Sequence, residues 1–385
     1  MGGPRVPLGW KNLVHDKRRL ALSTSGVAFA VMLILMQLGF RNALLDSQIE
    51  LLRQLNCDLV LVSDAKYRLV TNEPIPRRRI YQAKAHEAIA SAWPLYIEPL
   101  KLFWKDPETG NTHTIRVLGF DPDEPVFLND DIERHRLDLR TPDTVLLDRG
   151  CRTVLGLARS GVASELEGRN VRVVGTFNLG SDFVVDGNLI TSDRTFLTLT
   201  DLESSRPQLR KAELGLLRLK PGFEPDAVRQ SLSAMLPSDI QVLTKQEVID
   251  IEWNYWLAAA AVGTVFDLGV VVGFLVGFII CYQILFTELS DHLPQFATLR
   301  ALGHGNGRLI GVVLSQAFFL SLFGFFPAAL IGDLLYRLIA RFAGLEMRLT
   351  FDILTVVFVL TVSMCMFSGL VAARKAMKTD PAEVF

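Results

Sequence analysis

The sequence predicts an integral membrane protein with four transmembrane α-helices and a large α+β domain between the first two. Half of the 385 residues are hydrophobic, and they concentrate in four stretches without a charged residue. Each stretch is about 20 residues long, which is enough to cross roughly 30 Å of hydrocarbon. The stretches are Leu20–Phe40, Leu268–Thr287, Leu309–Gly332 and Ile353–Ala373. Between the first and the second, the composition is that of an ordinary globular domain.

Basic residues flank the first apolar stretch, and such residues keep their side of the membrane in the cytoplasm. They are Arg5, Lys11, Lys17, Arg18 and Arg19, against the single acid Asp16. The stretch is longer than the core of a signal peptide and ends without a small-x-small cleavage site, so we favour an uncleaved anchor. Four crossings return the C-terminus to the cytoplasm, where a second basic flank follows. It contains Arg374, Lys375 and Lys378.

The exterior segment, residues 41–255, is predicted to be a periplasmic α+β domain with a stalk helix at each end. An apolar stripe from Leu44 to Leu55 continues the first helix. Lys245–Trp256 is amphipathic, and its aromatic residues Trp253, Tyr255 and Trp256 are typical of a water–lipid boundary. Predicted strands are Asp58–Ser63, Ile115–Phe120, Thr144–Leu147, Val171–Phe177, Leu214–Leu219 and Ile240–Leu243, and predicted helices are Arg78–Ser91 and Pro225–Leu236. This order predicts two α/β lobes, or one lobe with a β insertion.

These observations together give a complete layout. It comprises a cytoplasmic segment (1–19), transmembrane helix 1 (20–40), the periplasmic domain (41–255), transmembrane helix 2 (256–287), a cytoplasmic segment (288–308), transmembrane helix 3 with an outer extension (309–340), a periplasmic loop (341–352), transmembrane helix 4 (353–373) and a cytoplasmic tail (374–385). At the outer end of helix 3, Asp333 and Arg337 are spaced for an i,i+4 ion pair.

Motifs for chemistry are missing from the sequence. It contains neither the GxxxxGK[ST] loop that holds nucleotide phosphates nor the GxSxG turn of a nucleophilic serine. The six histidines lack metal-site spacing, and a net charge of −1 gives no reason to expect nucleic acid. We therefore expect no catalytic residue, metal or cofactor in this chain. Cys57 and Cys151 could form a disulfide in an oxidising compartment, although unpaired buried thiols are favoured; Cys281 and Cys365 are predicted to face lipid or the helix core.

Two features of the second apolar stretch bear on packing. Asp267 lies at its outer end and is interpreted as a boundary residue, because an ion-coupled carrier usually places its acids near the midplane. Gly269, Gly273 and Gly277 form overlapping GxxxG patterns that flatten one helix face. That face could pack within the subunit or at a dimer seam, and the pattern does not separate the two.

The cytoplasmic segment 288–308 has the pattern of a short amphipathic helix. Leu293, Phe296, Leu299 and Leu302 share one stripe, whereas His292, Gln295, Thr298 and Arg300 are polar. Asp291 favours the start of the helix and Gly303 its end. Such a helix could contact a partner protein at the membrane face or lie on the lipid headgroups.

Two motifs resemble a known family. Gln295–Gly303, QFATLRALG, resembles the "EIGxLRALG" segment of the FtsX/MacB/LolC-type ABC transporter permeases, and Ala372–Glu383 resembles their "AARRAxxxDPAE" ending. The order of spans and exterior domain agrees with the family. Asp291–Gln295, with Trp10 and the following His-Asp-Lys-Arg-Arg, is similar to the cyanobacterial DevC branch. The family's usual acid and arginine are replaced here by Gln295 and Pro294.

The resemblance implies an exporter subunit in the bacterial inner membrane, with both termini in the cytoplasm and a MacB-like periplasmic domain. A permease homodimer would bind two ABC ATPase subunits, which hold the ATP and Mg. A periplasmic adaptor and a TolC-like outer-membrane protein would complete the export path. The implied ATPase-coupling residues are Asp291, Leu293, Gln295, Phe296, Thr298, Leu299, Arg300, Leu302 and Gly303. An FtsX-like signal transmitter and a LolC/E-like lipoprotein-releasing permease remain alternatives, and the substrate is left open.

Overall fold

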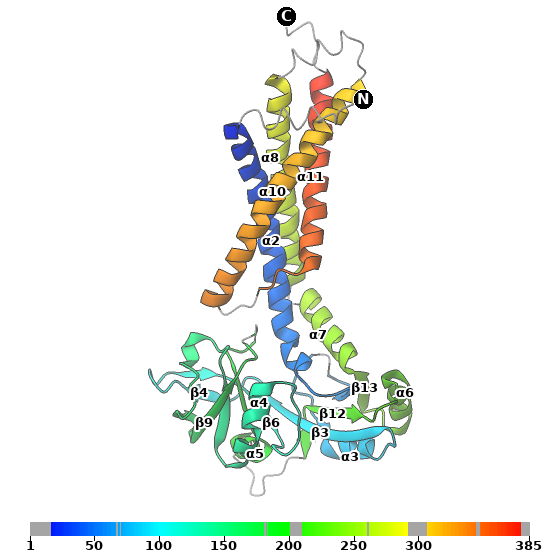
Figure 1. The fold of residues 1–385 in the computed structure, drawn as a ribbon. Helices are drawn as coiled ribbons and strands as arrows, with labels where there is room; N and C mark the ends of the chain where they lie inside the picture. Colours follow the sequence, from blue (N-terminus) through cyan, green and yellow to red (C-terminus); the bar gives the residue numbers. More distant parts are fainter. Residues whose placement is uncertain are drawn as a thin grey trace, which may run out of the picture. The chain divides into compact units, whose positions relative to one another are not determined.

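The structure is a computed structural model that describes residues 17–66, 68–69, 71–180, 182, 184–200, 210–259, 262–291, 306–343 and 347–378 (Figure 1). The chain divides into two compact units. The helical unit comprises Met1–Ala43, Val262–Phe342 and Glu346–Phe385. The α+β unit comprises Leu44–Ala261 with Ala343–Leu345.

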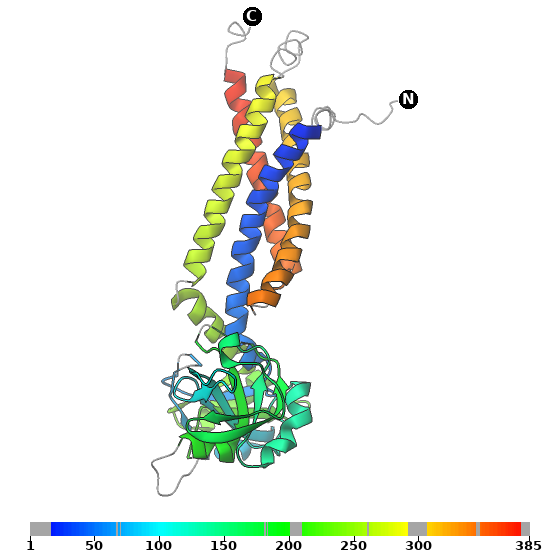
Figure 2. The ribbon, with the colours of Figure 1, turned by 90° about the vertical axis from the view of Figure 1, so that its left-hand side faces the viewer.

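Among the described residues, four helices build the helical unit, as predicted. They are α2 (Lys17–Arg53), α8 (Val262–Asp291), α10 (Asn306–Ala343) and α11 (Phe351–Lys378), and Figure 2 shows them side by side. All four are long and apolar enough to cross a membrane. Helix α2 continues past the first apolar stretch without a break, so its last residues belong to the α+β unit.

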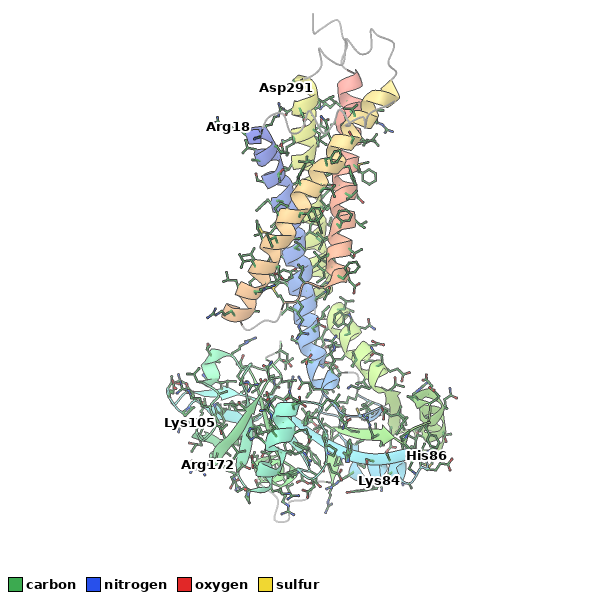
Figure 3. The ribbon with its side chains drawn as sticks, viewed as in Figure 1. Arg18, Lys84, His86, Lys105, Arg172 and Asp291 are labelled. Atoms are coloured by element: carbon green, nitrogen blue, oxygen red, sulfur yellow. The ribbon has the colours of Figure 1, made fainter. Side chains whose placement is uncertain are left out.

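Eleven strands form one mixed sheet in the order β13-β1-β12-β3-β6-β10-β7-β9-β8-β4-β5. Most neighbours are antiparallel; β6 with β10 and β7 with β9 are parallel. The strands are β1 (Leu59–Ser63), β3 (Ile89–Glu98), β4 (Phe103–Lys105), β5 (Thr112–Thr114), β6 (Arg116–Phe120), β7 (Thr144–Asp148), β8 (Ala163–Leu166), β9 (Arg169–Phe177), β10 (Asn188–Ser192), β12 (Leu214–Leu219) and β13 (Ile240–Thr244). A small second sheet pairs β2 (Ile75–Pro76) with β11 (Lys211–Ala212). In Figure 3, Lys84 and His86 mark one end of this unit, and Lys105 and Arg172 mark the other.

Both faces of the sheet are covered. Alternate residues of β1 enter different clusters: Leu59 and Leu61 lie in one, and Val60 and Val62 lie in the other. The first face packs against α3 (Arg77–Lys84), α5 (Asp193–Thr200) and α6 (Pro225–Met235). The second packs against the end of α2, α4 (Asp130–His135) and α7 (Lys245–Ala259). Double coverage explains why central strands such as β1 and β7 are continuous apolar runs, whereas β9 alternates.

The predicted helix Arg78–Ser91 is wrong at its C-terminal end. Helix α3 stops at Lys84, the chain turns at His86, whose ring accepts a bond from the amide of Ala88, and β3 starts at Ile89. The alanine-rich sequence favours a helix locally, but β3 pairs with β12 on one side and β6 on the other. This pairing also joins the strands of the two expected lobes into one sheet.

Candidate functional site

The predicted coupling segment lies almost wholly outside the described residues. Only Asp291 is described, and it is the last residue of α8. The other residues assigned to coupling are outside the described part of the chain: Leu293, Gln295, Phe296, Thr298, Leu299, Arg300, Leu302 and Gly303. Their helix therefore stays a prediction, and the structure contributes the helices on either side of them.

The three glycines of α8 lie against helices of the same chain. A Cβ at Gly277 would come within 2.7 Å of the Cβ of Ala30 on α2 and would overlap Met364 on α11. Nearer the start of α8, a Cβ at Gly273 would meet Ile34 at 3.0 Å, and one at Gly269 would overlap the end of Gln37. These glycines therefore allow close approach of α8 and α2 within one subunit.

Ion pairs join α2 and α8 at both ends. Arg19 binds Asp291 at 2.7 Å, and Arg41 binds Asp267 at 2.5 Å. Asp267, interpreted as a boundary residue, thus has a cationic partner on the neighbouring helix. Figure 3 labels Asp291 and Arg18, which precedes Arg19 in the chain, and both lie at the same end of the helical unit.

Sequence reasoning missed two polar contacts inside the helical unit. Tyr336 of α10 is buried and its hydroxyl donates to the main-chain oxygen of Leu35 on α2. Gly39 makes this approach possible, because a Cβ there would overlap the tyrosine. Glu288, placed by the sequence analysis in the polar segment, is buried within α8 and accepts a 3.1 Å bond from Gln316 of α10. The available signals were Glu288, which directly follows one apolar stretch, and Gln316, which lies inside another.

The side chain of Lys375 on α11 packs against the end of α8. Its ammonium lies 5.3 Å from the ring centroid of Phe286 and 5.8 Å from that of Tyr282, and the two rings are stacked. A cation over aromatic faces is attracted by their quadrupole. The basic C-terminal flank thus contributes to helix packing in addition to its expected role in orientation.

In the α+β unit, Lys245 connects the end of α2 with the start of α7. Its ammonium donates to the main-chain oxygens of Arg53, at 2.8 Å, and Leu55, at 2.6 Å. The Arg53 carbonyl is one of the unsatisfied acceptors at the C-terminus of α2, and Leu55 lies two residues beyond it. A cation at this end is also favoured by the helix dipole. Burial lowers the pKa of Lys245. One side chain therefore fixes the C-terminal end of one stalk helix to the N-terminal residue of the other.

A loop of the α+β unit holds α7 through directional bonds. The amide of Leu69 donates to Glu252 at 2.6 Å, and the indole of Trp256 donates to the other carboxylate oxygen at 2.8 Å. Arg68 binds the hydroxyl of Tyr255 at 2.8 Å. Burial raises the pKa of Glu252. Two of the aromatic residues expected at a lipid boundary therefore have partners inside their own unit.

A second acid, which is half-buried, lies beside the same loop. Glu213 faces Lys66 at 3.9 Å, and Lys66 donates to the carbonyl of Thr71 at 2.6 Å. Burial raises the pKa of Glu213 to about 7 and lowers that of Lys66. Desolvation thus outweighs the attraction between the two groups, so Glu213 titrates near neutral pH.

The described residues offer no cluster of three or more His, Cys, Asp and Glu side chains that could hold a metal ion. All four cysteines are free thiols. Burial raises the pKa of Cys57 to about 12, and it also raises the pKa of Cys151, so neither is an activated nucleophile. An open cleft of about 620 Å³ borders Arg53, Asp58 and Lys245, but it carries no arrangement of groups suited to catalysis.

Four apolar helices and an inserted α+β unit define a multi-pass membrane protein. Residues 267–381, which comprise most of α8 and all of α10 and α11, match the family model described as FtsX-like permease C-terminal. This match supports an FtsX/MacB-type permease and leaves the DevC branch untested. No curated protein matches the chain.

Two solved structures are similar to the α+β part of the chain. The periplasmic region of MacB from Actinobacillus actinomycetemcomitans is 12% identical, with a TM-score of 0.35, over 51% of this chain and 92% of that one. The extracellular domain of the noncanonic ABC-type transporter YknZ from Gram-positive bacteria is 9% identical, with a TM-score of 0.31, over 49% of this chain and 100% of that one. At these scores the likeness carries no conclusion about function.

Proposed function

We propose that this chain is the permease subunit of an ATP-driven exporter in a bacterial inner membrane. Both termini and the segment between α8 and α10 would face the cytoplasm, and the α+β unit would lie in the periplasm. ATP and Mg would be bound by a separate ABC ATPase chain. The observation that carries the proposal is the match of residues 267–381 to the FtsX-like permease C-terminal model.

Mechanical transmission is the mode of action that the helices support best. Helix α2 is a single α-helix from Lys17 to Arg53. It contributes Val27 and Ile34 to the core of the helical unit and Leu51 and Leu52 to a core of the α+β unit. A continuous helix with all its backbone bonds made is stiff. Motion applied to α2 in the membrane would therefore reach the α+β unit without loss in a flexible joint.

The proposed contact with the ATPase is the segment after Asp291. Phe296, Leu299 and Leu302 would supply the apolar surface, with Leu293 one turn earlier. Closure of two ATPase subunits around ATP would displace this segment, and the helices attached to it would carry the displacement across the membrane.

Substitution of Phe296 and Leu299 by Asp tests this assignment. Both changes place a charge on the predicted apolar stripe, so copurification of the ATPase and its stimulation by the permease should fall while membrane insertion is retained. His292→Asp is the matched control: it adds the same charge on the polar stripe of the same segment and should leave both properties intact. Full copurification with both stripe substitutions would remove the coupling assignment.

The finer parts of the proposal concern partners. We propose a permease homodimer that works with a periplasmic adaptor and a TolC-like outer-membrane duct, in the manner of the DevC branch. Purification of the complex from its native membrane distinguishes this proposal from the alternatives. An adaptor and a duct support export, a bound extracellular hydrolase would indicate an FtsX-like signal transmitter, and a second, different permease chain would indicate a LolC/E-like lipoprotein-releasing complex.

A further inference from the structure

Helices α2 and α8 stay in one antiparallel register along the whole span. Each step of three or four residues toward the C-terminus of α2 is matched by a step of three or four residues toward the N-terminus of α8. From one end to the other, the contacts of the four glycines that lie between these helices are Gly26 with Ile280, Ala30 with Gly277, Ile34 with Gly273, and Gln37 with Gly269. The same two faces therefore remain together from end to end, and the absent glycine side chains bring the backbones close.

The two ion pairs continue this register beyond the apolar contacts. Arg19–Asp291 follows the Gly26 contact at one end, and Arg41–Asp267 follows the Gln37 contact at the other. About 22 residues separate Arg19 from Arg41, which corresponds to roughly 33 Å of helix, and none of the residues between them is charged. Since the hydrocarbon layer is about 30 Å thick, each pair falls at a membrane boundary.

We infer that α2 and α8 move as one clamped pair, in which Asp291 acts through Arg19 to pass a displacement of the following segment to α2. The inference rests on the proposed function and deepens it. The carboxylate of Asp291 binds the first span of its own chain, so in this inference Asp291 acts as a positioning residue.

The arrangement explains how α2 can respond to the segment between α8 and α10. That segment is joined by the main chain to α8 at Asp291, and not to α2. The hydrophobic effect itself has little directional preference, so within the apolar region the close glycine contacts are what opposes sliding of α8 along α2. Ion pairs at both ends oppose sliding in either direction, since sliding separates the paired charges.

A cross-link between the two helices tests whether they move together. Arg19→Cys with Asp291→Cys should react with a short bismaleimide in native membranes, whether or not an ATPase is bound. Lys17→Cys with Asp291→Cys is the control, because residue 17 lies on another side of the helix and should cross-link poorly. The unlinked double-cysteine variant lacks the ion pair, so its permease-stimulated ATP hydrolysis should be about three- to tenfold below wild type, and cross-linking should return it to within about twofold of wild type. Failure of the first pair to cross-link, or no recovery of ATP hydrolysis on cross-linking, would overturn the clamped pair.

Charge reversal tests the role of the pair in coupling. Arg19→Glu and Asp291→Arg each place like charges together and should lower permease-stimulated ATP hydrolysis about three- to tenfold. The double reversal restores an opposite pair and should return most of the stimulation. Full stimulation in both single variants, or no recovery in the double variant, would contradict the inference. The neutral variants Arg19→Gln and Asp291→Asn also remove the ion pair and should lower stimulation. They do so without reversing a charge beside the span, which could alter membrane insertion.

Copurification separates this inference from the proposed function. In the Arg19 variants the ATPase should still copurify, because the apolar stripe and Asp291 are both unchanged. If the wild-type chain binds no ATPase, the proposed function fails, and the cross-link still reports on the helix pair. If the ATPase binds and the reversals have no effect on stimulation, the clamp fails and the proposed function stands.

Discussion

Replacement of Gly277 by alanine should destabilise the helical unit. The added Cβ would lie 2.7 Å from the Cβ of Ala30, whereas carbon atoms in contact are separated by about 3.5–4.0 Å. The thioether of Met364 also overlaps the new atom, but this flexible side chain can rotate away. The Cβ of Ala30 is fixed to the backbone of α2, so the two helices must separate by roughly 1 Å at this point.

The expected cost follows from overpacking. Forcing extra atoms into a close-packed interface typically costs about 1–3 kcal/mol, while alanine gains about 1 kcal/mol over glycine in helix propensity. Gly311 of α10 is the matched control, because nothing lies within 4 Å of a Cβ there. Its replacement by alanine should be neutral or stabilising. The difference between the two variants removes the propensity term, and it should therefore be about 1–3 kcal/mol.

Unfolding in mixed micelles measures this difference. The full-length protein in mild detergent would be titrated with SDS and followed by circular dichroism and by retention of its elution volume. Gly269→Ala adds a graded comparison, since its Cβ meets only the end of the Gln37 side chain and should cost less than Gly277→Ala. If Gly277→Ala unfolds at the same SDS fraction as Gly311→Ala, the close approach of α2 and α8 is wrong.

Three further changes test single contacts within the two units. Lys245→Met removes the two bonds at the end of α2 and should cost about 1–2 kcal/mol in SDS or thermal unfolding, whereas Lys84→Met on the surface should cost less than about 0.5 kcal/mol. Because the pKa of Glu213 is raised from 4.5 to about 7, the folded state binds the extra proton. Stability should therefore fall as pH rises from 4.5 to 7 and level off above. Glu213→Gln should make this slope shallower in thermal melts, while Glu252, whose pKa is also raised by burial, keeps its own contribution. Tyr336→Phe keeps the ring but loses the bond to Leu35, and should lower unfolding stability by about 1 kcal/mol; an unchanged midpoint would show that the hydroxyl contributes nothing there.

Local properties of the sequence were enough to find the four spans and most central strands. A span needs only a sufficient length of uncharged apolar residues, and α2, α8, α10 and α11 all contain one. Doubly covered strands such as β1 and β12 can be identified from their leucine- and valine-rich sequences. The i,i+4 pair of Asp333 and Arg337 was likewise predictable, and it forms at 2.7 Å.

Nonlocal pairing explains what the sequence could not provide. Strand β3 has an alanine-rich start that favours a helix, and only its pairing with β12 and β6, both distant in sequence, makes it extended. Short strands such as β4 and β5 have three residues each, too few to establish an alternating pattern. Small local preferences are overridden wherever tertiary pairing is available.

The candidate site shows the same limit more strongly. Arg19 and Asp291 are 272 positions apart, and each is an ordinary polar residue at the end of an apolar run. Tyr336 is one tyrosine among many aromatic residues, and its partner is a main-chain oxygen that no side-chain pattern can indicate. The glycine pattern did predict a close-packed face of α8, but a pattern on one helix does not specify which helix approaches it.

Hydrogen bonds and ion pairs on α2 are the contacts by which the proposed mechanism would transmit motion along this helix. Apolar burial favours proximity but is largely indifferent to a slide of one smooth helix face along another, whereas hydrogen bonds and ion pairs weaken steeply when distance and angle change. In the helical unit α2 is held by Tyr336 on the carbonyl of Leu35 and by the ion pairs of Arg19 and Arg41. In the α+β unit Lys245 holds the carbonyls at its C-terminal end. A helix held in register in this way can pass on rotation as well as translation, because these contacts add to the resistance that the close fit of Gly277 against Ala30 already gives to sliding.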